Sequence, residues 1–241
     1  MTRPHKHQMS QYNTTKKTIV SINKVTLIPL NCSFGVVTKK DTRVFLEDAV
    51  KSERKKEKGT VTIVFAVRRP GCGGCREHGL QLKNLWEQEK KLQGVALMGI
   101  VKESGVDDAA LLEFNSKYFP FPLYQDSEWK VYKALGGRKI TTLHLLRGFF
   151  SSLRRHKENK IQTKMGPGDG FVQGGILVFD KNGELRYVEH EIYGKLFDLE
   201  ALVTAAEEAR TPLSAAVVEK RKPRLEVSTS LTSPSSVSAS A

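Results

Sequence analysis

Apolar positions in the centre of the chain first predict a strand–helix–strand unit. Two runs of mostly β-branched and other apolar residues, 60–67 and 95–101, predict buried strands. Between them, apolar residues recur at i, i+3 and i+4, which predicts a helix over 76–92. Because such a unit joins parallel strands through a crossover helix, the loops that follow the strands lie at one sheet edge. Ligands usually bind at that edge.

The second half of the chain predicts more helices and then a hairpin. In order, we expect helices over 107–118, 127–135 and 146–153, strands over 175–180 and 184–189, and a last helix over 199–209. Lys181-Asn182-Gly183 supplies the turn of the hairpin. This order predicts an α/β fold: a central mixed sheet covered by helices, with a helical insertion before the C-terminal hairpin.

The two ends of the chain differ in composition from the middle. Residues 1–40 contain seven Lys and Arg, several Ser and Thr, and no acidic residue, which predicts a basic, disordered leader or, alternatively, an organelle transit peptide. Residues 211–241 end in a run of Ser, Thr, Val, Ala and Pro that buries too little apolar surface to fold. The 241 residues therefore predict one domain, over 41–210, between two tails.

The net charge of +13 is concentrated in these tails. Residues 1–40 carry +7 and residues 211–241 carry +2, which leaves +4 for the domain. A basic balance in the tails, without interleaved aromatic residues, gives no reason to expect a nucleic-acid partner. No apolar run approaches the ~20 residues of a membrane span. Three cysteines do not make the disulfide framework of a small secreted protein.

A basic run accompanies the predicted helical insertion. It consists of Arg147, Arg154, Arg155, His156, Lys157, Lys160 and Lys164. Such a run is most often a solvated face. The alternative is an amphipathic helix that touches a membrane surface weakly and meets lipid peroxides there. The glycine-rich residues 166–170 that follow are expected to form a loop, without the Lys-Ser/Thr of a phosphate-binding loop.

The segment with the clearest chemistry lies between the first predicted strand and helix. Cys72 and Cys75 are separated by two glycines at the start of that helix. The free N–H groups and positive dipole end of a helix N-terminus stabilise a thiolate, the reactive form of cysteine. The nearby Arg68, Arg69 and Arg76 add positive charge. The spacing lets the second thiol close a disulfide with the first, so we predict redox chemistry.

Other uses of this cysteine pair fit the sequence less well. A structural zinc site needs four ligands, and the pair with His78 supplies three, while Cys32 lies far upstream. An iron–sulfur cluster needs more cysteines. We therefore predict no metal and no bound cofactor. His78 itself is expected to be a surface residue rather than a proton donor, and Trp86 a core residue.

Several motifs together carry a resemblance to a known family. They are Arg68-Arg69-Pro70-Gly71-Cys72-x-x-Cys75-Arg76-Glu77, Val101-Lys102-Glu103, Phe121-Pro122-Leu123-Tyr124-Gln125-Asp126, Trp129-Lys130-Val131-Tyr132 with Leu135-Gly136, Leu146-Arg147-Gly148-Phe149, residues 168–175 and Tyr187-Val188-Glu189-His190. With these motifs the chain resembles, over 41–210, the peroxiredoxin-like 2 family, AhpC/TSA-type antioxidant enzymes with a thioredoxin-like fold.

The resemblance implies a thiol oxidoreductase that reduces peroxides or endoperoxides. Its electrons would come from thioredoxin and NADPH, or from another dithiol. Cys72 is expected to attack and Cys75 to resolve; the reverse stays open, because the peroxiredoxin Thr-x-x-Cys pattern puts the reactive cysteine second. Arg68, Arg69, Arg76 and Gln173 are expected to stabilise the thiolate or the substrate.

Two features depart from the related families. Gln173-Gly174-Gly175 stands where thioredoxins usually place a cis-proline, and Pro70 lies only two residues before Cys72, without the peroxiredoxin threonine. A non-catalytic redox-sensing or basic binding protein on the same scaffold is therefore the alternative function. Because the thiols must be re-reduced, we expect a cytoplasmic location, or a plastid or mitochondrion if the leader is a targeting segment.

Overall fold

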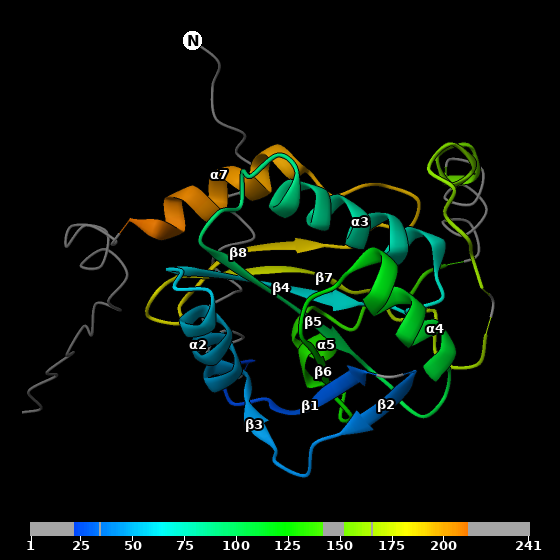
Figure 1. Cartoon of the computed structure of the whole chain (residues 1–241), viewed down its shortest axis with the longest axis horizontal. Coiled ribbons are helices and arrows are strands. Elements are labelled where there is room, and N and C mark those ends of the chain that lie inside the picture. Colours follow the sequence, from blue (N-terminus) through cyan, green and yellow to red (C-terminus); the bar gives the residue numbers. More distant parts are fainter. Residues whose placement is uncertain (1–21, 34, 142–151, 165, 212–241) are drawn as a thin grey trace, which may run out of the picture. The chain divides into compact units, whose positions relative to one another are not determined.

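The chain folds around one mixed β-sheet. A computed structural model describes residues 22–33, 35–141, 152–164 and 166–211 (Figure 1). The strands are β1 (Thr26–Ser33), β2 (Val36–Lys39), β3 (Val44–Phe45), β4 (Val61–Val67), β5 (Val95–Val101), β6 (Leu123–Gln125), β7 (Gly175–Phe179) and β8 (Leu185–His190). The helices with complete bounds are α2 (Leu46–Lys56), α3 (Gly73–Glu87), α4 (Asp108–Glu113), α5 (Lys130–Ala134) and α7 (Leu199–Arg210), and a π-helical turn, Phe114–Tyr118, continues α4.

The strand order is β2-β1-β6-β5-β4-β7-β8, with β3 paired to β1. β4 and β5 are parallel and joined through α3, while β7 is antiparallel to β4 and forms a hairpin with β8. This is the predicted α/β arrangement, a thioredoxin-like fold. Its β4–α3 turn lies at the carboxyl end of the central strand β4. The hairpin is confirmed as well, and its antiparallel register brings residues 174 and 191 to the same edge as the end of β4.

β4 and β5 are buried along their whole length, because other elements cover both faces of the sheet. On one face Ile63 and Phe65 pack in a cluster with residues of α3, the α4 region and α7. On the other, Val64 and Ala66 pack with residues of α2 and α5. Alternate residues of a strand point to opposite faces, so a strand that is covered on both faces is apolar at nearly every position. The polar residue of β4, Thr62, donates its hydroxyl to the carbonyl oxygen of Val50.

The expected start of the domain at residue 41 is wrong. Residues 26–39 form β1 and β2, and β1 extends the sheet by pairing with β6. Ile22, Val25 and Leu27 are buried in the core, which fixes this segment to the domain. The strand continues through Pro29, which pairs with Tyr124 of β6. The rest of the expected leader, 1–21, and the expected tail from 212 lie outside the described residues.

The helical insertion is described in part. Residues 152–158 are helical and lie at the end of the molecule where β4 runs into α3 (Figure 1). Of the stripe expected over 146–153, residues 146–151 lie outside the described residues, as does Arg147 of the basic run. Residues 166–170 form no helix or strand, as expected for a loop.

Candidate redox site at the turn between β4 and α3

The two cysteines lie where the sequence places them. Cys72 is the residue before the first turn of α3 and has an extended backbone, and Cys75 lies within that turn. Cys75 is fully buried and Cys72 is 8% exposed. Both are free thiols. The pair therefore combines a helix N-terminus with a largely desolvated environment, in which nearby charges act strongly.

The two thiols differ sharply in acidity. Hydrogen bonds from the Cys75 thiol and backbone N–H, together with the charge of Arg68, outweigh burial and lower the pKa of Cys72 to about 6. Burial, and the hydrogen bond that the Cys75 thiol donates to Cys72, raise the pKa of Cys75 well above its ordinary value. At pH 7 the pair therefore carries one thiolate, on Cys72, and one thiol, on Cys75.

Arg68 contacts the sulfur of Cys72 directly. Its Nη2 donates to Cys72 Sγ at 2.7 Å, and its Nη1 donates to the carbonyl oxygen of Gly170 at 2.9 Å. The guanidinium is only 5% exposed and lies 4.8 Å from the ring centroid of Tyr193. Burial would lower the pKa of Arg68, but the charges of Glu191 and the two cysteines raise it, so the group stays charged.

Glu191 holds Arg68 in this orientation, and the sequence interpretation missed it. One carboxylate oxygen accepts from Arg68 Nε and the other from the backbone N–H of Gly174, both at 2.9 Å. Burial would raise the pKa of Glu191, but Arg68, His78 and the Gly174 N–H lower it. A signal was available: an acidic residue directly after the second strand of the hairpin lies at the edge that carries the β4–α3 turn.

The other residues expected to stabilise the thiolate have different contacts. Arg76 is completely buried and donates to Pro70 O, Gln162 O and Glu113. Its guanidinium therefore ties three segments together, contrary to the expected role at the sulfur.

Arg69 and Gln173 contact neighbouring loops. Arg69 Nη1 donates to Gly166 O at 2.9 Å, and its Nη2 donates to Lys164 O at 3.4 Å. Gln173 is buried just before β7, and its backbone N–H donates to Arg138 O. Of the four residues expected to stabilise the thiolate or the substrate, Arg68 is thus the one whose described contacts include the sulfur of Cys72.

The expected surface position of His78 is wrong. Its ring is 3% exposed, lies tilted against Phe197 with 4.0 Å between centroids, and contacts Lys195 O through Nε2 at 3.1 Å. The residue lies on the face of α3 that packs against the sheet, and burial lowers its pKa, so the ring is neutral. Trp86 is partly buried against the same core and donates to Val95 O.

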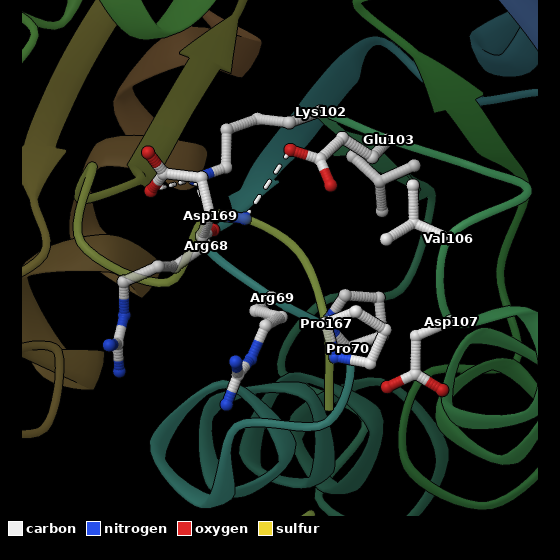
Figure 2. A pocket seen from close by; sticks show the side chains of 10 residues that line it. Arg68, Arg69, Pro70, Lys102, Glu103, Val106, Asp107, Pro167 and Asp169 are labelled. Atoms are coloured by element: carbon white, nitrogen blue, oxygen red, sulfur yellow. Dashed lines mark hydrogen bonds and ion pairs between the residues drawn. The ribbon is translucent and has the colours of Figure 1, made fainter. Parts of the chain in front are cut away.

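A shallow hollow, partly open to solvent, lies beside the Cys72 turn. Figure 2 shows Arg69 and Pro70 on one side of it, and Lys102 with its amino group at Asp169 on another. Neither cysteine lines the hollow. Lys102 is itself buried and donates to the carbonyl oxygens of Asp169 and Val172, so its charge is compensated within the protein.

The described part of the basic run packs partly against the protein. Arg155 and His156 contact the carboxylate of Glu77, and Lys164 contacts Glu113. These three residues are therefore unlike the freely solvated face that the sequence suggested.

Over the described ranges, no helix reaches the length and apolar character of a membrane span, and no group of three metal-ligating side chains is found.

Gly174 has no space for a side chain. A Cβ at this position would overlap the carbonyl oxygen of Ala66 and lie 3.4 Å from the backbone nitrogen of Arg68. We expect Gly174→Ala to lower the free energy of unfolding by about 3 kcal/mol, the upper end for overpacking, because backbone atoms of β4 cannot move aside. Gly74→Ala is the control, since its Cβ would meet ordinary contacts at 3.8 Å or more. Equal urea midpoints for the two variants would contradict the expectation.

Sequence comparison gives the relationship of this chain to known proteins. Residues 81–191 match the AhpC/TSA antioxidant enzyme family. Peroxiredoxin-like 2A of Gallus gallus is 32% identical over 171 residues, which cover 68% of this chain and 70% of the relative. The chain belongs to the peroxiredoxin-like family. Peroxiredoxin-like 2A of Xenopus tropicalis is 32% identical over 147 residues.

The regions aligned with this chain do not extend over the full length of the related proteins. The aligned region spans about three-fifths of the length of the first curated relatives, 62% for the Xenopus tropicalis protein. Among solved structures, the bacterioferritin comigratory protein of Xanthomonas campestris has a TM-score of 0.44 at 16% identity, covering 76% of this chain and 92% of that chain.

Proposed function

We propose that this chain reduces peroxides with Cys72 as the attacking thiolate and Cys75 as the resolving thiol. The observation that carries the proposal is the hydrogen bond from Arg68 to Cys72 Sγ at 2.7 Å, beside a second thiol that stays protonated. With a pKa of about 6, roughly nine-tenths of Cys72 is thiolate at pH 7. The thiolate is the nucleophilic form of cysteine.

The proposed cycle has three steps. The Cys72 thiolate attacks one oxygen of the O–O bond; the bond breaks, its electron pair leaves with the other oxygen, and a proton from solvent completes an alcohol or water. Cys72 is now a sulfenic acid. The sulfur of Cys75 then attacks Cys72, water leaves, and the two residues form a disulfide. An external dithiol reduces this disulfide through a mixed disulfide and is itself oxidised.

The partners of this cycle are a peroxide, which includes lipid peroxides, and a thioredoxin-like dithiol that takes its electrons from NADPH or another thiol system. The chemistry uses the protein's own sulfur atoms and needs no bound cofactor. Because the disulfide must be reduced again, we propose a reducing compartment, the cytoplasm or the interior of a plastid or mitochondrion.

Single-turnover oxidation tests the proposal. The reduced wild-type protein is mixed with hydrogen peroxide, and intact mass and peptide mapping locate the product. We expect a Cys72–Cys75 disulfide in the wild type and, in Cys75→Ser, a sulfenic acid on Cys72 that dimedone traps. A dimedone adduct on Cys75 in Cys72→Ser, with none on Cys72 in Cys75→Ser, would reverse the roles.

The same assay separates the enzyme from a redox sensor. With reduced thioredoxin and excess hydrogen peroxide, an enzyme oxidises many equivalents of thioredoxin. A protein that forms the disulfide once, and then turns over no further with thioredoxin or dithiothreitol, would instead be the non-catalytic redox-sensing alternative.

A further inference from the structure

Residues 152–164, called the strap here, cross the turn that carries Cys72. The backbone N–H of Lys164 donates to Gly71 O at 2.8 Å. A Cβ on Gly73 would come within 2.5 Å of His156 Cε1 and overlap the side chain of Thr163. Gly71 and Gly73 are the two neighbours of Cys72, so the strap packs against the chain on both sides of the reactive residue.

Polar contacts hold most of the strap. Ser152 and Ile161 are its buried residues, and most of the others are exposed. The side chain of Glu77 on α3 accepts from Arg155 Nε at 3.0 Å and lies 3.3 Å from His156 Nε2. A segment with so little buried apolar surface opens more readily than the core of a domain. At the other end of the strap, Gln162 O accepts from Arg76 and Lys164 pairs with Glu113. Glu77 with Arg155 therefore holds the helical end of the strap, residues 152–158, and this pair is called the latch.

In the ion pair that forms the latch, the carboxylate of Glu77 is almost completely desolvated, whereas Arg155 is partly exposed. This carboxylate is 3% exposed, and Arg155 is 28% exposed. Burial would raise the pKa of Glu77, but His156 and Arg155 lower it, so the carboxylate is charged. Arg155 also donates to Gly194 O, close in sequence to Tyr193, whose ring covers Arg68. The strap therefore joins the two sides of the Cys72 site.

We propose that the strap selects the reactants of Cys72 by size, with Glu77 and Arg155 as the residues that set the selection. With the strap docked, Cys72 is 8% exposed, which suffices for hydrogen peroxide and other small hydroperoxides. A bulky hydroperoxide reaches the sulfur only after the strap leaves Glu77. The inference about hydroperoxides rests on the proposed function of Cys72, whereas the inference about access to Cys72 does not.

Alkylation measures access without any peroxide chemistry. In the full chain with Cys32→Ser and Cys75→Ser, Cys72 is the single cysteine. Its rate constants are measured with iodoacetamide, which is small, and with a polyethylene-glycol maleimide, which is bulky. The ratio of the bulky to the small rate constant is then compared among variants, because a change in the acidity of Cys72 cancels in this ratio.

Glu77→Gln and Arg155→Gln each release the latch, and the second alters only a partly exposed side chain should the first fail to fold. Glu158→Gln is the matched control, since Glu158 lies on the strap but pairs with the exposed Arg154. We expect the ratio to rise about tenfold in the two latch variants, between the effects of a surface pair and a fully buried pair, because Arg155 is partly exposed. The ratio should change less than twofold in the control. Hydrogen exchange of 152–164 should quicken in the same two variants.

The same variants are then oxidised with hydrogen peroxide and with cumene hydroperoxide. The rate with cumene hydroperoxide should rise relative to that with hydrogen peroxide. The size selection is overturned if the alkylation ratio does not change in the latch variants. It is also overturned if that ratio rises but the rate with cumene hydroperoxide does not rise relative to the rate with hydrogen peroxide. If Cys72 shows the expected alkylation pattern but reacts with neither hydroperoxide, the proposed function fails and the strap's control of access stands.

Discussion

Replacing Cys72 with serine is expected to reduce peroxide consumption to the uncatalysed background. A serine hydroxyl stays protonated beside Arg68, and without an adjacent base it is a weak nucleophile. The remaining thiol of the pair does not compensate, because burial and the neighbouring groups raise the pKa of Cys75 well above its ordinary value. Stopped-flow mixing with hydrogen peroxide and reduced thioredoxin measures the loss.

Cys32→Ser is the matched control, because it also removes one thiol. Cys32 lies on β1, is partly exposed, and has a pKa that burial and Asp108 raise, so it is not poised for attack. We expect this variant to keep the wild-type rate. Activity that survives in Cys72→Ser but disappears in Cys32→Ser would contradict the assignment of the reactive residue.

Replacing Arg68 with methionine is expected to have the largest effect on stability. It leaves the carboxylate of Glu191 buried at 3% exposure without its cation, and breaking such a buried pair costs about 3–5 kcal/mol. The control is Arg154→Met, whose exposed pair with Glu158 contributes about 0.3–0.5 kcal/mol. Urea unfolding at pH 7 compares the two variants.

The effect of Arg68→Met should also depend on pH. The pKa of Glu191 in the folded protein is below its ordinary value of 4.5, so the pair stabilises the fold above that pH. The contribution disappears as the pH falls below 4.5 and the carboxylate becomes protonated. The difference in unfolding free energy between wild type and Arg68→Met should therefore shrink toward pH 3. A difference that stays constant over this range would show that the pair is not its source.

The sequence predicted the parts of the fold that follow local patterns. The largely apolar runs of β4 and β5 predict buried strands, the apolar period of α3 predicts a helix, and Lys181-Asn182-Gly183 predicts a turn, each from local sequence alone. Because Cys72 and Cys75 lie between two such elements, their place at a strand–helix turn was predictable. Arg68 was also a reasonable candidate, since it directly follows β4.

The features that were missed depend on contacts between distant residues. Glu191 lies 123 positions from Arg68, and its role follows from the antiparallel register of the hairpin. The burial of His78 and the direction of Arg76 depend on which face of α3 meets the sheet and which meets the strap. β1 was missed because the environment of its short apolar run is supplied by β6, far along the chain.

The pH dependence of Cys72 alkylation in the otherwise unmodified chain tests the central claim most directly. The rate of iodoacetamide attack on Cys72, followed by peptide mass at each pH, reports the fraction of thiolate. With Arg68 and the Cys75 thiol donating to its sulfur, Cys72 should show a midpoint near pH 6. A midpoint of about 8.5, the value of an ordinary cysteine, would contradict the account.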